Sequence, residues 1–132
     1  MTYLLDVNAL VALGFAQHEF HERVANWVRG QHYPLLATCS ITELGFIRVL
    51  AQAPSYGFTL SQARSLLLRM KQASKCPLTF IPDNHDVSHL PGWVRVARQT
   101  TDGHLAGLAR ANGGLLATLD RAIPGSYLIP ES

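Results

Sequence analysis

The chain has 132 residues, of which 48% are hydrophobic and 15% are charged, and its formal net charge is +2. This length predicts a single domain over residues 1–132, large enough to bury roughly two thirds of its unfolded surface. The composition excludes an intrinsically disordered chain. The mild net charge excludes nucleic-acid binding that relies on overall charge, so local charges must decide that question.

Neither export nor membrane insertion is indicated. Residues 1–16 are largely apolar, but Asp6 interrupts them, and they lack a basic start and a small-residue cleavage site. No uninterrupted apolar run approaches the roughly 18 residues that a membrane span needs. Cys39 and Cys76 have no C-x-x-C spacing and are expected to be reduced thiols. We therefore predict a cytoplasmic protein without a membrane partner.

The first predicted strand ends in a carboxylate. Tyr3-Leu4-Leu5 has the length and apolarity of a buried parallel strand, and a helical pattern begins at Val7. Asp6 therefore stands at a strand-to-helix junction. Because open α/β sheets bind ligands at the carboxyl edge of their strands, Asp6 is a candidate site residue.

The rest of the sequence alternates helices and strands. Helices are predicted over Glu19–Arg29, Ile41–Gln52, Thr59–Ala73 and Asp102–Ala111, and strands over Leu35–Thr38, Leu78–Ile81, Leu115–Thr118 and, at the edge, Tyr127–Ile129. The spacing predicts that Ile41, Leu44, Ile47 and Leu50 face inward, as do Leu60, Ala63, Leu67 and Met70. Residues 85–99 are expected to be mostly irregular. This order predicts an α/β fold, a three-layer α/β/α sandwich with a central, mainly parallel sheet of four to five strands.

Four of the nine acidic residues occupy telling positions, namely Asp6, Glu43, Asp102 and Asp120. Asp6 and Asp120 each follow an apolar strand, and Glu43 lies in the first turn of the helix after strand 35–38. These three carboxylates are expected at one edge of the sheet. Asp102 begins the helix before the last long strand, so the preceding loop must bring it there.

Each acid also has a purely structural interpretation. Asp6 could cap the next helix, and Ser40-Ile41-Thr42-Glu43 fits a capping box. Asp102 could complement a helix macrodipole, and Asp120 could be a turn residue. Carboxylates gathered in one pocket, however, repel one another unless a cation offsets them. Oxygen ligands without a Cys or His set suit Mg²⁺ or Mn²⁺, which predicts metal-dependent phosphodiester hydrolysis.

Four short motifs around these acids occur in a characteristic order. They are Leu4-Leu5-Asp6-Val7-Asn8, Thr42-Glu43-Leu44, the stretch Thr101–Ala109 and the stretch Leu116–Asp120. By these motifs, nearly the whole chain resembles PIN-domain ribonucleases, and more narrowly the VapC-type toxins of bacterial toxin–antitoxin pairs.

The resemblance implies a Mg²⁺- or Mn²⁺-dependent endoribonuclease that leaves a 5′-phosphate and a 3′-hydroxyl. It implies that Asp6 and Asp102 bind the metal directly and that Asp120 completes the site, directly or through water. Glu43 would bind a second ion or orient the attacking water. Asn8 and Thr118 stand where the family places polar groups that orient ligands. A homodimer, inhibited by a small antitoxin whose tail fills the groove, is implied as well.

Other candidates for contacts with RNA or protein are less specific. Arginines near the acids in sequence could contact RNA phosphates, namely Arg48, Arg95, Arg98 and Arg121. Trp27, Leu68 and Met70 lie on apolar helix faces and could contact a partner, although core packing is the preferred interpretation. An RNA substrate of this kind is expected to be single-stranded or looped.

Three alternative functions remain to be compared. His85-Asp86-Val87-Ser88-His89 resembles a zinc-protease motif, but it lacks the Glu and a helical setting. A haloacid-dehalogenase-like phosphohydrolase would need D-x-D, where this chain has Asn8, and a lysine at a strand end, where Lys71 and Lys75 are not expected. The third alternative is a PIN-like module that binds RNA or protein without catalysis.

Overall fold

The computed structural model describes residues 1–131 and contains one five-stranded sheet. Its strands are β1 (Thr2–Leu5), β2 (Leu35–Thr38), β3 (Leu78–Phe80), β4 (Gly114–Thr118) and β5 (Tyr127–Leu128). Their order is β3-β2-β1-β4-β5, and all four neighbouring pairs are parallel. The predicted parallel sheet is therefore confirmed, with β5 as a short strand at one edge.

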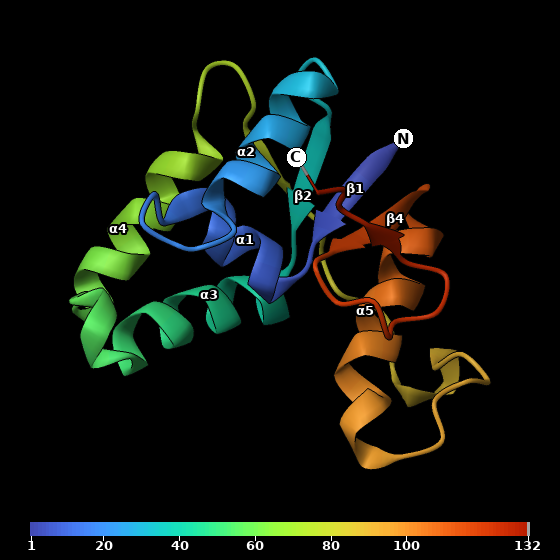
Figure 1. Cartoon of the computed structure of the whole chain (residues 1–132). Coiled ribbons are helices and arrows are strands. Elements are labelled where there is room, and N and C mark those ends of the chain that lie inside the picture. Colours follow the sequence, from blue (N-terminus) through green and yellow to red (C-terminus); the bar gives the residue numbers. More distant parts are fainter. Residues whose placement is uncertain (132) are drawn as a thin grey trace.

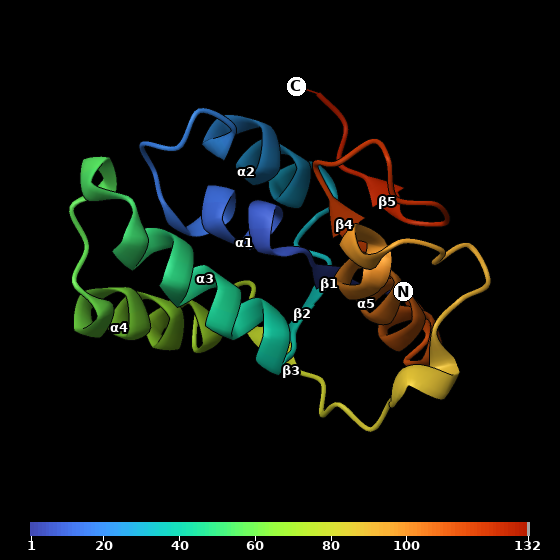
Figure 2. The same cartoon turned by 90° about the horizontal axis from the view of Figure 1, so that it is seen from below.

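Helices cover both faces of this sheet (Figures 1 and 2). They are α1 (Val7–Gly14), α2 (His21–Gly30), α3 (Ser40–Gln52), α4 (Leu60–Lys71) and α5 (Thr100–Ala111). Successive strand residues point to opposite faces. Accordingly, Leu5 packs into the core beneath α1 to α4, whereas Leu4 packs into a second core beneath α5. The structure is thus the expected three-layer α/β/α sandwich.

The strand order creates a switch point beside β1. The chain passes from β1 to β2 and β3 on one side, then returns through α5 to β4 and β5 on the other side. In parallel α/β sheets, the crevice at the carboxyl ends of the two strands at such a point is the usual ligand site. Here those strands are β1 and β4, whose next polar residues are Asp6 and Asp120.

Predicted element boundaries lie within two residues of the observed ones. Helix α2 begins at His21 rather than Glu19, because the backbone N–H of Phe20 donates to His18 Nδ1 at 3.0 Å and the chain is still turning there. Helix α5 begins at Thr100, so Asp102 lies inside its first turn. Residues 85–99 are irregular apart from the short 3₁₀ turns Val87–His89 and Ala97–Gln99, as predicted.

The predicted inward faces of two helices are wrong in part. Leu44 of α3 is 59% exposed and Leu60 of α4 is 56% exposed. The buried residues of α3 are instead Thr42, Gly45, Phe46 and Leu50. Helix α1 determines this rotation, because Gly45 lies so close to Val7 that a β-carbon added there would come within 2.5 Å of the valine methyl.

Within residues 1–131, no helix combines the length and the apolarity needed to cross a bilayer. Cys39 and Cys76 are both free thiols, as expected.

The close packing of β1 against β4 gives a first prediction. A β-carbon added at Gly114 would lie 1.8 Å from the backbone oxygen of Thr2, which cannot move away without breaking the sheet. We expect Gly114→Ala to lower the free energy of unfolding by about 1–3 kcal/mol or more, measured by urea denaturation. Gly92→Ala is the matched control, since nothing lies within 4 Å of a β-carbon there. Equal unfolding midpoints for the two variants would contradict the strand pairing.

Candidate active site

The carboxylate of Asp6 is the most buried charge at the carboxyl edge of the sheet. Asp6 follows β1 and caps α1, and its Oδ1 accepts the backbone N–H of Val7 at 2.9 Å. The capping interpretation of Asp6 is therefore confirmed, but it uses one oxygen only. Oδ2 accepts the hydroxyl of Thr118 at 2.7 Å, and the residue is only 8% exposed.

Thr118 connects the ends of β1 and β4. Its buried hydroxyl donates to Asp6 and accepts the backbone N–H of Asp120 at 3.0 Å. The Asn8 side chain lies beside it: Nδ2 donates to Thr118 Oγ1 at 3.3 Å, and Oδ1 accepts the backbone N–H of Leu119 at 3.2 Å. Asn8 and Thr118 thus orient the segments that carry Asp6 and Asp120.

Asp6, Asp102 and Asp120 interact electrostatically across this edge. Burial raises the pKa of Asp6, hydrogen bonds from Thr118 and Val7 lower it, and the charge of Asp120 raises it again; the net shift is upward. Burial also raises the pKa of Asp102, and the charges of Asp6 and Asp120 add to that increase. Asp120 accepts the backbone N–H of Ala122 at 2.8 Å, so it is also the turn residue that the sequence allowed. Asp102 thus lies within electrostatic reach of the other two aspartates.

Glu43 lies in the first turn of α3 but has a different environment. The expected capping box is wrong: Cys39 is the N-cap, and its backbone N–H donates to the hydroxyl of Thr42 at 3.0 Å. The Glu43 side chain is therefore not needed for capping. Its Oε2 accepts the hydroxyl of Thr38 at 2.6 Å and lies 2.7 Å from Lys71 Nζ. Glu43 is not among the charges that shift the pKa of Asp6 or Asp102.

The donor atoms of the aspartate cluster fit a hard divalent cation. Within residues 1–131, no group of three or more His, Cys, Asp or Glu side chains is arranged so that it could hold a metal ion by itself. Mg²⁺, however, usually keeps several waters and takes only one or two carboxylates from the protein. The three aspartates provide oxygen ligands, and among the described residues none of them has a Lys, Arg or His nitrogen within 4.0 Å.

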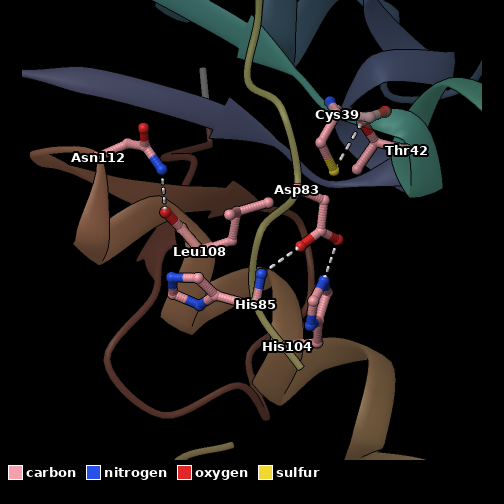
Figure 3. A network of polar contacts seen from close by, with 7 residues as sticks. All are labelled: Cys39, Thr42, Asp83, His85, His104, Leu108 and Asn112. Atoms are coloured by element: carbon pink, nitrogen blue, oxygen red, sulfur yellow. Dashed lines mark hydrogen bonds and ion pairs between the residues drawn. The ribbon is translucent and has the colours of Figure 1, made fainter. Parts of the chain in front are cut away.

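Two contacts near the site were not predicted. Asp83 follows β3, and its Oδ2 lies 2.5 Å from His104 Nε2 on α5, while Oδ1 accepts the backbone N–H of His85 (Figure 3). Burial opposes ionisation of Asp83, but these hydrogen bonds and the nearby imidazoles outweigh it and lower its pKa. This pair joins the segment after β3, which crosses the molecule in Figure 2, to the helix that carries Asp102.

The second contact that the sequence did not predict involves Lys71. We expected it to lie away from the strand ends, but its ammonium reaches Glu43 and lies 5.1 Å from the centre of the Phe80 ring at the end of β3. Only its place in the last turn of α4, directly before β3, could have indicated this.

The candidate RNA-binding arginines are all exposed, namely Arg48, Arg95, Arg98 and Arg121. Arg121 is 3.4 Å from Glu131, and both side chains are largely solvated. Of the three candidate partner-contact residues, Trp27 is buried, Met70 is half-buried, and Leu68 is 52% exposed.

The zinc-protease interpretation of the histidine pair is not supported. His85 and His89 lie in an irregular segment with a single 3₁₀ turn, and their rings stack with centroids 4.2 Å apart. This arrangement does not converge on a metal as two rings on one helix face would.

Comparison with known proteins identifies relatives over almost the whole chain. No family model matches the sequence. Three ribonucleases of Mycobacterium tuberculosis strain H37Rv are similar to this chain. VapC38 is 36% identical over 128 residues, which cover 91% of this chain and 86% of the relative. VapC44 is 34% identical, with coverages of 93% and 89%, and VapC39 is 34% identical, with coverages of 96% and 94%.

Solved structures share the fold. The crystal structure of Mycobacterium tuberculosis VapC20, described as a Sarcin-Ricin loop cleaving toxin, superposes with a TM-score of 0.64 at 11% identity, covering 98% of this chain and 99% of that one. VapBC2 from Rickettsia felis, bound to a DNA fragment from the promoter, gives a TM-score of 0.56 at 16% identity, covering 97% of both chains. The expected PIN-like fold is thereby confirmed. The sequence identity to three curated ribonucleases, over nine tenths of this chain or more, shows that it belongs to the VapC family.

Proposed function

We propose that this protein is a Mg²⁺- or Mn²⁺-dependent endoribonuclease and the toxin of a toxin–antitoxin pair. The observation that carries the proposal is a cluster of three aspartates, with raised pKa values for Asp6 and Asp102, at the switch point of a VapC-family sheet. Burying a carboxylate such as that of Asp6 beside other negative charges is costly unless a cation neutralises it. A divalent cation bound by these carboxylates could in turn bind the phosphate of a phosphodiester, so such a substrate suits this site better than a neutral one.

Each residue of the cluster has a distinct role in this proposal. Asp6 and Asp102 would hold the cation, and Asp120 would complete the site directly or through water. Thr118 keeps one oxygen of Asp6 fixed, so that the carboxylate is oriented before the metal arrives. When bound, the cation supplies positive charge for the scissile phosphate and makes a nearby water a better nucleophile.

RNA would be held mainly through its phosphates. The exposed Arg95, Arg98 and Arg121 lie on segments flanking Asp102 and Asp120, and Arg48 lies on α3 beyond Glu43. The site is at an open edge of the sheet, which can accept an unstacked strand more easily than a duplex. We therefore propose a single-stranded or looped substrate.

We further propose a small antitoxin as the partner, a homodimer as the assembly and the cytoplasm as the location. The VapBC2 structure of Rickettsia felis, which shares this fold, supports an antitoxin. A hollow between α3 and α4, lined by Leu44, Ile47 and Leu68 and bordered by Glu43, leaves apolar surface exposed beside the site. Such a surface suits a protein partner.

The first test replaces the central ligand. Asp6→Asn keeps the shape and the capping acceptor but removes the charge, so we expect cleavage of an RNA substrate in Mg²⁺ to fall by at least about 100-fold. Asp86→Asn is the matched control, because Asp86 is an exposed aspartate that caps the Val87–His89 turn, and its activity is expected to equal that of the wild type. Full activity of a folded Asp6→Asn variant would exclude Asp6 as an essential ligand.

The same variant predicts a pH dependence of stability. Because the folded-state pKa of Asp6 is raised, the folded protein binds more protons than the unfolded chain between the ordinary value of 3.8 and the raised value. Ionised Asp6 thus destabilises the metal-free fold at neutral pH. At pH 7 in EDTA, we expect Asp6→Asn to unfold at a higher urea concentration than the wild type. This difference in unfolding midpoint should shrink as the pH falls through the raised pKa of Asp6 toward 3.8.

Comparing the two proteins at each pH isolates Asp6 from Asp83 and Asp86, whose lowered pKa values have the opposite effect. Adding Mg²⁺ at about 100 times its Kd is expected to stabilise the wild type by about 2.7 kcal/mol, and Asp6→Asn by much less. If the difference in unfolding midpoint between the two proteins does not change with pH, Asp6 is not a buried carboxylate that its neighbours repel.

The orienting role of Thr118 can be tested separately. Thr118→Val keeps the volume but leaves Asp6 Oδ2 and the Asp120 N–H without their partner, so we expect Mn²⁺ affinity to fall by about 10–100-fold. Thr118→Ser retains the hydroxyl and is expected to restore affinity. Isothermal titration calorimetry gives the values. Equal Mn²⁺ affinity in Thr118→Val and the wild type would show that the hydroxyl does not orient the ligand.

A further inference from the structure

Lys71 and Glu43 form the closest ion pair between a lysine or arginine and an acid in the described part of the chain. Lys71 Nζ lies 2.7 Å from Glu43 Oε2, and the two side chains are 24% and 21% exposed. The same oxygen accepts the Thr38 hydroxyl at 2.6 Å, and the ammonium lies 5.1 Å from the centre of the Phe80 ring. The pair is therefore held by the ends of β2 and β3 and by helices α3 and α4.

The four acids at this sheet edge thus differ in how their charges are balanced. Glu43 already has a cation at contact distance, and its second donor, Thr38, is fully buried. The three aspartates have no basic nitrogen within 4.0 Å among residues 1–131. The need for an added cation therefore lies on the aspartate side of the edge, and not on the Glu43 side.

We propose that the ammonium of Lys71 takes the position of a second metal ion, so that this protein binds one divalent cation and not two. The inference rests on the proposed metal site at Asp6, Asp102 and Asp120. A second ion at Glu43 would have to expel a partly desolvated ammonium from a hydrogen-bonded carboxylate and from the face of Phe80. It would also have to lose water, which Mg²⁺ does reluctantly.

The position of Lys71 also defines what Glu43 does. A carboxylate whose Oε2 is engaged by both Lys71 and Thr38 is held in a single orientation. Lys71 is therefore a positioning residue for Glu43, and it supplies a fixed positive charge on the Glu43 side of the site. Its effect should appear in the number of metal ions bound, a quantity that a purely structural ion pair would not change.

The test counts Mn²⁺ ions bound to the purified full chain. Titrations followed by the electron paramagnetic resonance signal of free Mn²⁺, and repeated by calorimetry, are expected to give about one ion for the wild type. Lys71→Met leaves Glu43 without its cation, and we expect about two ions. Lys71→Arg retains the charge and should bind one. Lys75→Met, which removes an exposed lysine from the turn after α4, is the matched control and should also bind one.

The double variant Lys71→Met/Glu43→Gln should return to one ion, because the second site then lacks its ligand. Glu43→Gln alone, which keeps Lys71, should also bind one ion with unchanged affinity; this measurement decides the matter if Lys71→Met does not fold. Two ions in the wild type, or one in folded Lys71→Met, would overturn the role of Lys71 and leave the aspartate site standing. A wild type that binds no Mn²⁺ would overturn the proposed metal site itself.

Discussion

The buried carboxylate of Asp6 is the constraint around which this sheet edge is arranged. It lies at the switch point between β1 and β4, where the backbone N–H of Val7 and the hydroxyl of Thr118 satisfy its two oxygens. Hydrogen bonds orient a charge without neutralising it, so burial and the neighbouring Asp120 still raise its pKa. The result is an oriented, uncompensated anion beside two others, which is a suitable environment for a divalent cation.

The same edge deals with negative charge in two different ways. On the side of β2 and β3, Lys71 neutralises Glu43 from within the chain. On the side of β1 and β4, Asp6, Asp102 and Asp120 have only each other and hydrogen-bond donors. In the proposed function, an external cation would therefore bind on the side of the aspartates, and the substrate phosphate would approach that cation. The Asp83–His104 pair joins the segment after β3 to α5, the helix that carries Asp102.

Much of this architecture could be predicted from the sequence, because it depends on local patterns. Short apolar runs separated by helical periods predict a parallel sheet, and a parallel sheet places every strand end at one edge. Asp6 and Asp120 follow strands directly, so their meeting required no knowledge of side-chain packing. Asn8 and Thr118 are next to them in sequence and share their location. The N-terminal cap of α4 is equally local, since Thr59 and Gln62, three residues apart, form a capping box.

Tertiary structure decided the features that depend on how one helix packs against another. Periodicity shows that α3 has an apolar stripe, but Val7 against Gly45 determines which part faces inward, and Leu44 therefore faces solvent. Likewise, Cys39 and Thr42 cap α3, so the Glu43 side chain is not needed there. The packing of α4 places Lys71 against the Glu43 carboxylate instead. The sequence by itself determined the fold class and the aspartates at the strand ends, because strand direction and residue order are local properties. Which acid is neutralised by a lysine of the same chain, and which acids have no such partner among the described residues, was decided only by packing, because that depends on the approach of helices distant along the chain.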